Sequence, residues 1–231
     1  MKTIRLDNVS KVYQRHFALH RVTTEFNAGQ LTLVLGGNGA GKTTLMNLLA
    51  TLEPPSDGSI RFGDWDFETF SRRGRRNIGW VSHDSLLYPE LSGRENLEFY
   101  AKMYGIKNPS KTAQDWLERI ELSAAADKRV RTYSRGMKQR LSIARALIHR
   151  PALVLLDEPM TGLDHRSKDV MLRIFDEARS QGQIVVMITH DFSVPISMAD
   201  RVIILDQGKL VFHDSTHEGM NLADLYLEKT S

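Results

Sequence analysis

Apolar residues along this chain follow two spacings, one typical of strands and one typical of helices. Short, almost wholly apolar runs at residues 31–35, 152–156 and 184–188 predict strands that are buried on both faces, as in a parallel sheet covered by helices. Alternating or shorter apolar runs predict further strands at residues 3–6, 17–26, 59–62, 78–81, 202–205 and 209–212.

Apolar residues at helical spacing predict helices at residues 45–50, 94–104, 112–120, 135–149, 166–180 and 219–227. The block from about residue 84 to 149 has helical segments and no strand-like run, so we expect a helical lobe inserted into a sheet domain. Strands that alternate with helices elsewhere predict an α/β fold with a mainly parallel sheet.

The strand at 31–35 leads into a glycine-rich stretch, Gly36-Gly37-Asn38-Gly39-Ala40-Gly41-Lys42-Thr43-Thr44. A loop of this spacing between a strand and a helix is typical of a phosphate-binding loop. Glycines let backbone N–H groups converge on an anion, and the helix N-terminus adds partial positive charge. We expect Lys42 to reach the β- and γ-phosphates and Thr43 to offer its hydroxyl to Mg²⁺. The stretch predicts binding of a nucleoside triphosphate, but not the use of its energy.

Polar residues suited to phosphate chemistry follow other predicted strands. Asp157 and Glu158 follow the strand at 152–156, and His190 follows the strand at 184–188. Ligands of an open parallel sheet bind beyond the carboxyl ends of its strands, so we expect one shared site. There Asp157 is suited to hold Mg²⁺, Glu158 to orient or deprotonate water, and His190 to contact the γ-phosphate. Taken singly, the acids also fit a solvated turn, and His190 an ordinary histidine.

A second candidate anion site lies at the start of the helix at 135–149. Read locally, Ser134 caps this helix and Gly136 weakens it slightly. A hydroxyl, a glycine and free N–H groups at a helix N-terminus also form an anion site. Since one nucleotide rarely needs two such sites, the excess indicates a second subunit.

Composition narrows the setting. The 231 residues are 41% hydrophobic and 26% charged, which is ordinary for a soluble globular protein. Because 31 basic and 28 acidic residues leave a net charge of only +3, direct binding of nucleic acid is not expected. The absence of cysteine excludes disulfides. With neither a signal-peptide pattern nor an apolar run of about 20 residues, we expect a cytoplasmic protein that reaches a membrane only through another chain.

These residues together resemble the ATP-binding cassette ATPases, the nucleotide-binding subunits of ABC transporters, over nearly the whole chain. The matching motifs are the Walker A loop at 36–44, the Walker B strand at 153–158, the signature motif at 134–137, the D-loop at 161–164, the switch histidine His190 and the adenine-stacking aromatic Tyr13. The resemblance implies a P-loop NTPase with a RecA-like, mainly parallel sheet, an N-terminal antiparallel β lobe and an inserted helical lobe at about 84–149. All of these would form one domain over 1–231, with the core and β lobe at about 1–83 and 150–231.

The resemblance also implies ATP and Mg²⁺ as cofactors and a role for each matching residue. It gives catalytic roles to Lys42, Glu158 and His190, and metal contacts to Thr43, Asp157 and His83. The residues that it places against ATP are Tyr13, Gly36, Gly37, Asn38, Gly39, Ala40, Gly41, Lys42, Thr43, Thr44, Ser134, Gly136 and Asp164. Two copies would pair head to tail around ATP, and an integral membrane permease would hold them at the cytoplasmic face.

Two departures from the family pattern limit what is carried over. His83 stands where the family usually has a glutamine, so its reach to the metal differs. Tyr133 and Arg135 stand where leucine and glycine are commoner, so phosphate contact is expected of Ser134 and Gly136 only. Short segments at 81–91 and 133–137 are similar to the haem-exporter ATPase of cytochrome c maturation and to ABC-2-type exporters.

Other functions stay open at this point. A soluble cassette protein acting on ribosomes or nucleic acid usually has two cassettes or long inserted arms, and neither is present here. A small P-loop kinase would have no use for the signature motif. Four apolar residues lie where the family receives its membrane partner, although lobe core is an equal interpretation for each: Leu86, Leu87, Tyr88 and Phe99.

Overall fold

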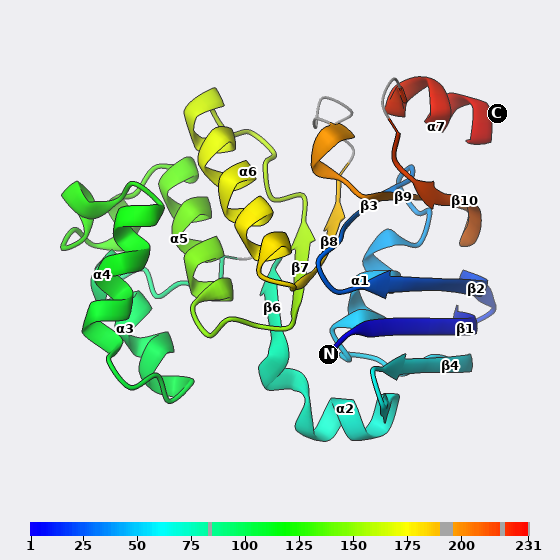
Figure 1. Cartoon of the computed structure of the whole chain (residues 1–231), viewed down its shortest axis with the longest axis horizontal. Helices are drawn as coiled ribbons and strands as arrows, with labels where there is room; N and C mark the ends of the chain where they lie inside the picture. The colour runs from blue at the N-terminus through cyan, green and yellow to red at the C-terminus, as the bar shows by residue number, and fades with distance from the viewer. Residues whose placement is uncertain (83–84, 190–195, 218–219, 231) are drawn as a thin grey trace.

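A six-stranded sheet forms the centre of the molecule (Figure 1). The structure, a computed structural model, describes residues 1–82, 85–189, 196–217 and 220–230. The strand order is β10-β9-β3-β8-β7-β6, with every neighbouring pair parallel except β9 and β10. The strands are β3 (Leu31–Leu35), β6 (Ile78–Val81), β7 (Leu153–Asp157), β8 (Ile184–Ile188), β9 (Arg201–Asp206) and β10 (Lys209–Ser215). The predicted mainly parallel sheet is confirmed.

Burial on both faces explains why the central strands have continuous apolar sequences. All five residues of β3 and all five of β8 are buried. Helices provide the cover on the two faces: α1 (Lys42–Leu49), α6 (His165–Ser180) and α7 (Leu222–Thr230). α7 begins three residues later than expected, and residue 219 lies outside the described residues.

The N-terminal part forms a second, four-stranded antiparallel sheet with the order β2-β1-β4-β5. Its strands are β1 (Thr3–Tyr13), β2 (His16–Asn27), β4 (Asp57–Phe62) and β5 (Trp65–Asp66). β1 is much longer than the predicted 3–6. Register shifts after Leu6 and Val9 break the alternation of apolar and polar residues, so the sequence pattern ends before the strand does. The antiparallel β lobe is thereby confirmed.

Sequence analysis missed β5 and the helix that follows it, α2 (Phe67–Arg73). Asp66 caps α2 by accepting a hydrogen bond from the Thr69 backbone N–H at 2.7 Å. Phe70 is buried and stacks on Phe62 with ring centroids 4.0 Å apart. A helix of two turns is too short to show a periodic apolar pattern. The contact that holds α2, Phe70 on Phe62, is made with β4 and cannot be seen in the local sequence.

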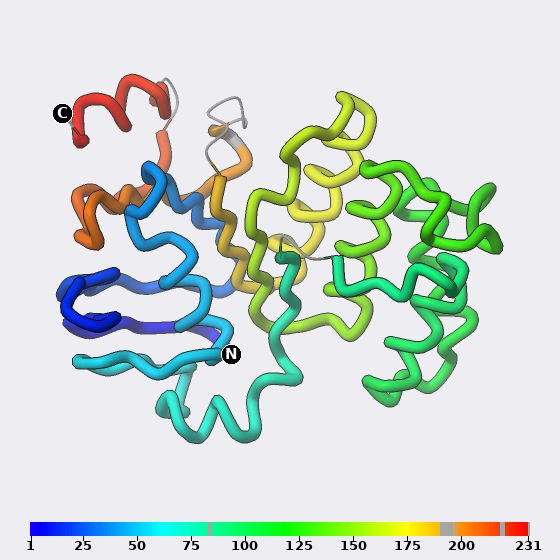
Figure 2. The backbone as a smooth tube through the Cα atoms, turned by 180° about the vertical axis from the view of Figure 1, so that it is seen from behind, coloured from blue at the N-terminus to red at the C-terminus, as the bar shows by residue number. Residues whose placement is uncertain are grey.

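Three longer helices gather at one end of the molecule, beyond β6, and both views show this arrangement (Figures 1 and 2). They are α3 (Gly93–Met103), α4 (Pro109–Arg119) and α5 (Arg135–Leu147). On α5 the apolar side chains of Leu141 and Ala144 are buried. Tyr133, the departure just before α5, is also buried, and its hydroxyl donates to the Ala125 carbonyl at 2.7 Å.

Candidate active site

The glycine-rich loop at 36–44 runs between β3 and α1, and at two of its positions, Gly36 and Gly41, only glycine fits. Gly41 has a φ of +103°, and a Cβ there would lie 2.4 Å from the Ala18 carbonyl oxygen. A Cβ on Gly36 would lie 2.5 Å from the carbonyl oxygen of Leu205, on β9. The glycine spacing therefore lets the loop pass directly against the backbone of β2 and β9.

Lys42 opens α1 and links the loop to the acidic end of β7. Its Nζ donates hydrogen bonds to the carbonyl oxygens of Gly36, at 2.7 Å, and Gly37, at 2.9 Å. Burial lowers the pKa of Lys42, and the negative charges of Glu158 and Asp157 oppose this. The two carboxylates therefore lie near enough to Lys42 for their charges to act on it.

The rest of the loop differs in accessibility. Ala40 is buried, whereas Asn38, Gly39 and Thr43 are exposed. The exposed Thr43 hydroxyl and the half-buried Asp157 carboxylate are oxygen donors suited to Mg²⁺. Among the described residues there is no group of three or more His, Cys, Asp and Glu that could hold a metal alone. The donors present therefore fit an ion that is shared with nucleotide phosphates.

Glu158 adopts an unusual backbone conformation at the end of β7. Its φ is +49°, and its N–H donates to the Ile188 carbonyl of β8 at 3.0 Å. Its Oε2 accepts from the Thr161 hydroxyl at 3.2 Å and, more weakly, from the Thr189 hydroxyl at 3.5 Å. Strained backbone that the surroundings fix in place is typical of functional positions. The carboxylate is thereby held between two hydroxyls that sequence analysis did not identify.

A hollow of about 540 Å³ lies in front of this acidic pair. Asp157, Glu158 and Thr161 line one side, and Arg135 and Lys138 from the start of α5 line another. Gln139 joins the two sides by donating from its Nε2 to the Pro159 carbonyl at 3.0 Å. The hollow thus combines carboxylates with cations, a suitable surrounding for water and a phosphate group. His83 and His190 lie outside the described residues, so their roles stay predictions.

Tyr13 ends β1 on the side of the loop helix. Tyr13 is 40% exposed, and its hydroxyl donates to Glu53 Oε2 at 2.7 Å. An exposed ring held at its hydroxyl is suited to stack on a nucleotide base. The predicted contact with adenine has this geometry in its favour.

Ser134 and Asp164 both cap helices. Ser134 Oγ accepts from the Met137 N–H at 3.3 Å, and Asp164 accepts from the Ser167 N–H at 2.8 Å. A Cβ on Gly136 would lie 3.6 Å from an Asp164 carboxylate oxygen, so the starts of α5 and α6 adjoin. Figure 1 shows α5 and α6 on one side of β7 and α1 on the other. The signature residues therefore lie beside the D-loop, and strands β7 and β8 separate them from β3 and its loop.

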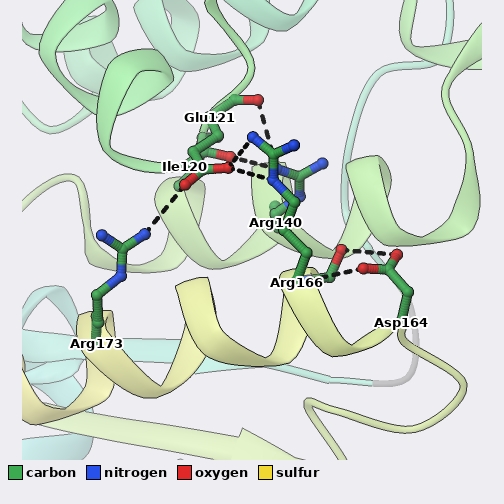
Figure 3. A network of polar contacts seen from close by, with 7 residues as sticks. Ile120, Glu121, Arg140, Asp164, Arg166 and Arg173 are labelled. Carbon is green, nitrogen blue, oxygen red and sulfur yellow. Dashed lines mark hydrogen bonds and ion pairs between the residues drawn. The ribbon is translucent and has the colours of Figure 1, made fainter.

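A polar network ties the helical lobe to α6 (Figure 3). Glu121, just after α4, accepts from Arg166 Nε at 2.9 Å and from Arg173 Nη2 at 3.2 Å. Arg140 of α5 donates to the Ile120 carbonyl at 2.8 Å. Hydrogen bonds from Arg166, with its charge, hold the pKa of Glu121 below its ordinary value. These contacts fix the start of α5 relative to α6 through groups on three elements.

His149, just after α5, is a half-buried histidine, and it makes stability depend on pH. Its Nε2 lies 3.2 Å from the Ile78 carbonyl, and its ring stacks on Tyr104 at 3.8 Å. Burial lowers the His149 pKa from 6.5 to about 4. Between these values the unfolded chain binds a proton that the folded chain excludes. Stability from this group is therefore full above pH 6.5 and is lost as the pH falls towards 4, by roughly 3 kcal/mol.

We expect the variant His149→Phe, which keeps an aromatic ring over Tyr104, to lose this pH dependence. Its free energy of unfolding should fall less steeply than that of the unchanged protein between pH 6.5 and 4.5. Urea denaturation of both proteins at several pH values measures the difference. Parallel curves would show that His149 does not titrate in this way.

Comparison with known proteins assigns the family. A family model described as ABC transporter matches residues 19–161. The chain belongs to the ABC transporter family. It is an ABC ATPase, and the predicted P-loop fold is confirmed. A solved structure titled as an ATP-binding subunit of an ABC transporter superposes with a TM-score of 0.90 at 25% identity, covering 99% of each chain.

Curated relatives differ in what their names say. This ABC ATPase is 31% identical to the linearmycin resistance ATP-binding protein LnrL of Bacillus subtilis over 90% of its length and 68% of the relative's. It is 34% identical to the daunorubicin resistance protein DrrA3 of Streptomyces coeruleorubidus, with 93% and 69% covered. It is also 34% identical to the sulfate/thiosulfate import protein CysA of Mesorhizobium japonicum, with 90% and 62% covered. The chain thus spans about two thirds of the length of these relatives.

A dimeric ATP-binding cassette bound to ADP and phosphate superposes with a TM-score of 0.83 at 26% identity, covering 93% of this chain and 99% of that one. That structure holds the products of ATP hydrolysis, in line with the activity of the family. Within the described ranges, none of the helices of this ABC ATPase has the length and apolar character needed to cross a bilayer.

Proposed function

We propose that this chain is the ATP-hydrolysing subunit of an ABC exporter. It pairs head to tail with a second copy of itself and drives a separate integral membrane permease from the cytoplasmic face. The observation that carries the pairing is the division of the site. Lys42 and its loop follow β3, whereas the start of α5, with Ser134, lies on the far side of β8 and β7 from that loop (Figure 1). The dimeric cassettes among the solved relatives support a second copy as the source of the missing half.

In this proposal each part of the site has one task. The loop at 36–44 and Lys42 bind the triphosphate, Thr43 and Asp157 hold Mg²⁺, and Tyr13 stacks on adenine. When bound there, Mg²⁺ would supply charge neutralisation for the phosphates. Glu158 orients the attacking water, and the hydroxyls of Thr161 and Thr189 keep its carboxylate aimed.

The remaining groups come from the far side of the pair. Ser134 and the N–H groups at the start of α5 in the second copy would face the γ-phosphate. Gly136 allows close approach there, and Asp164 holds the adjoining start of α6. His190 would contact the γ-phosphate and His83 would approach the metal, as the family resemblance implies.

An exposed apolar patch supports the membrane partner. It consists of Leu86, Tyr88 and Phe99, which are 53%, 45% and 42% exposed. The rings of Tyr88 and Phe99 pack edge to face with centroids 5.0 Å apart. Leu87 differs, because it is partly buried against the core. Clustered exposed apolar side chains mark interaction surfaces, which favours docking over lobe core for the three patch residues.

Export is the direction that the resistance relatives support. LnrL and DrrA3 carry names of drug resistance, whereas CysA is named as an import protein. The alternative is a soluble protein that acts on ribosomes or nucleic acid. The only feature in its favour is the net charge of +3, which is small. We therefore take the permease as the partner.

Replacing Phe99 in the patch by Glu should detach the protein from membranes. The fraction that sediments with native membranes is expected to fall by about tenfold, since central aromatic residues dominate interfaces. Trp65→Glu is the matched control, because Trp65 is an aromatic residue of similar exposure, 40%, that lies outside the patch. It belongs to β5 of the four-stranded sheet, whereas Phe99 belongs to α3. Equal sedimentation of both variants, or sedimentation with ribosomes, would contradict the membrane partner.

A further inference from the structure

Glu53 lies at the centre of a polar cluster beside Tyr13. Its Oε2 accepts from the Tyr13 hydroxyl at 2.7 Å and pairs with Lys11 Nζ at 3.1 Å. Its Oε1 accepts from Asn47 Nδ2 at 3.2 Å. Tyr13 and Lys11 belong to β1 and Asn47 to α1, so one carboxylate joins the β lobe to the helix that follows the phosphate-binding loop.

A second side chain contacts Tyr13 through its ring. Lys11 Nζ lies 5.2 Å from the ring centroid and donates to the Pro54 carbonyl at 2.9 Å. Tyr13 nevertheless stays 40% exposed. The ring is therefore held at its hydroxyl by Glu53 and contacted by the ammonium group of Lys11.

The charge states of this pair suit a strong hydrogen bond. Burial and then Glu53 raise the pKa of Tyr13, so the phenol keeps its proton. The bond from Tyr13 is the main cause that lowers the pKa of Glu53, so the carboxyl stays ionised. A hydrogen bond from a neutral donor to an ionised acceptor is stronger than one between neutral groups.

We propose that Glu53 is a positioning residue for adenine, which holds the Tyr13 ring in its stacking orientation and ties that ring to the helix of the phosphate-binding loop. The inference rests on the proposed function, because it takes Tyr13 as the adenine contact. Without Glu53 the ring would lose its fixed orientation. Binding of the base would then have to order the ring, and this loss of conformational entropy would weaken the affinity. In this proposal Tyr13 contacts the base and not the phosphates, so binding of the phosphates themselves should not weaken.

Charge alone predicts the opposite sign, which makes the proposal testable. Glu53 places a negative charge near a site for an anionic ligand, so its removal would strengthen binding of any phosphate compound. A positioning role instead weakens binding of ATP and leaves tripolyphosphate, which has no base, equal or slightly tighter. Glu53→Asp separates the two accounts further, because it keeps the charge but withdraws the carboxylate from Tyr13.

The experiment is calorimetric titration of the purified chain with ATP and with tripolyphosphate, without Mg²⁺ so that no hydrolysis occurs. Glu53→Ala and Glu53→Asp should each raise the Kd for ATP about threefold to tenfold. The Kd for tripolyphosphate should not rise. Tyr13→Phe, which keeps the ring and removes the hydroxyl, should match Glu53→Ala, and the double variant should lose little more, because the two residues act through one bond. Glu68→Gln, an exposed acid on α2, is the control for lost surface charge and should change neither Kd.

Four outcomes decide between the accounts. Unchanged ATP affinity in both Glu53 variants would overturn the positioning role, as would equal weakening of ATP and tripolyphosphate. Tyr13→Ala tests the underlying assignment separately. If Tyr13→Ala leaves the ratio of the two Kd values unchanged, Tyr13 is not the adenine contact. If that ratio changes only with Tyr13→Ala, the adenine contact stands and the role of Glu53 fails.

Discussion

Glu158→Gln is expected to abolish steady-state ATP turnover while ATP binding is retained. Gln keeps the shape of the side chain and its contacts with Thr161 and Thr189, but it cannot take a proton from water. Loss of a positioned general base costs about 10²- to 10⁴-fold in rate. Because bound ATP is then not consumed, the variant should accumulate as a dimer. Phosphate release and size-exclusion chromatography with ATP and Mg²⁺ measure the two effects.

The matched control is Glu177→Gln, on the exposed face of α6, where Glu177 pairs with Arg119. This variant should hydrolyse ATP at the unchanged rate and remain dependent on pairing. Undiminished hydrolysis by Glu158→Gln would show that another group activates the water. A Glu158→Gln protein that fails to bind ATP would instead show that the carboxylate has a structural role.

Gly41→Ala should lose nucleotide binding by at least about 100-fold. The added Cβ would lie 2.4 Å from the Ala18 carbonyl oxygen, at a φ of +103° that alanine rarely adopts. Such strain costs about 1–3 kcal/mol even before the clash moves the loop away from β2. Calorimetric titration with ATP measures the loss, and circular dichroism confirms that the variant is folded.

Gly105→Ala is the control for backbone strain alone. Gly105 has a φ of +72°, but no atom lies within 4 Å of an added Cβ, and it follows α3 in the helical lobe. This variant should unfold more easily by about 1 kcal/mol and bind ATP as before. Similar losses of ATP affinity in both glycine variants would contradict the account of the loop.

The sheet could be predicted from sequence where burial alone decides the pattern. β3 and β8 are buried on both faces, so their sequences are continuously apolar and their bounds were predicted to the residue. β1 could not be bounded in this way, because register shifts after Leu6 and Val9 move side chains out of alternation. α2 was missed because its stability depends on Phe70 stacking on Phe62, a contact made by the fold.

The site shows the same division. The glycine-rich loop and the acids after β7 could be recognised because each is a local pattern with its own chemistry. The groups that hold Glu158 could not, since Thr189 meets it only through the pairing of β7 with β8. The bond between Tyr13 and Glu53 joins residues 40 positions apart, and no local pattern indicates it.

The apolar patch lies between these cases. Its apolar character was visible in the sequence, but exposure decides its meaning. The structure leaves Leu86, Tyr88 and Phe99 facing solvent and partly buries Leu87. An apolar residue at a given position in a helical lobe can face either way, so only the fold distinguishes docking surface from core.

The dependence of specific ATPase activity on protein concentration tests the central claim, that one chain carries only half of a working site. Where the pair is weak, activity per milligram should rise with concentration and level off once the dimer forms, because Ser134 of one copy must meet Lys42 of the other. Constant specific activity, from a protein that sedimentation shows to be a monomer throughout, would contradict the paired mechanism.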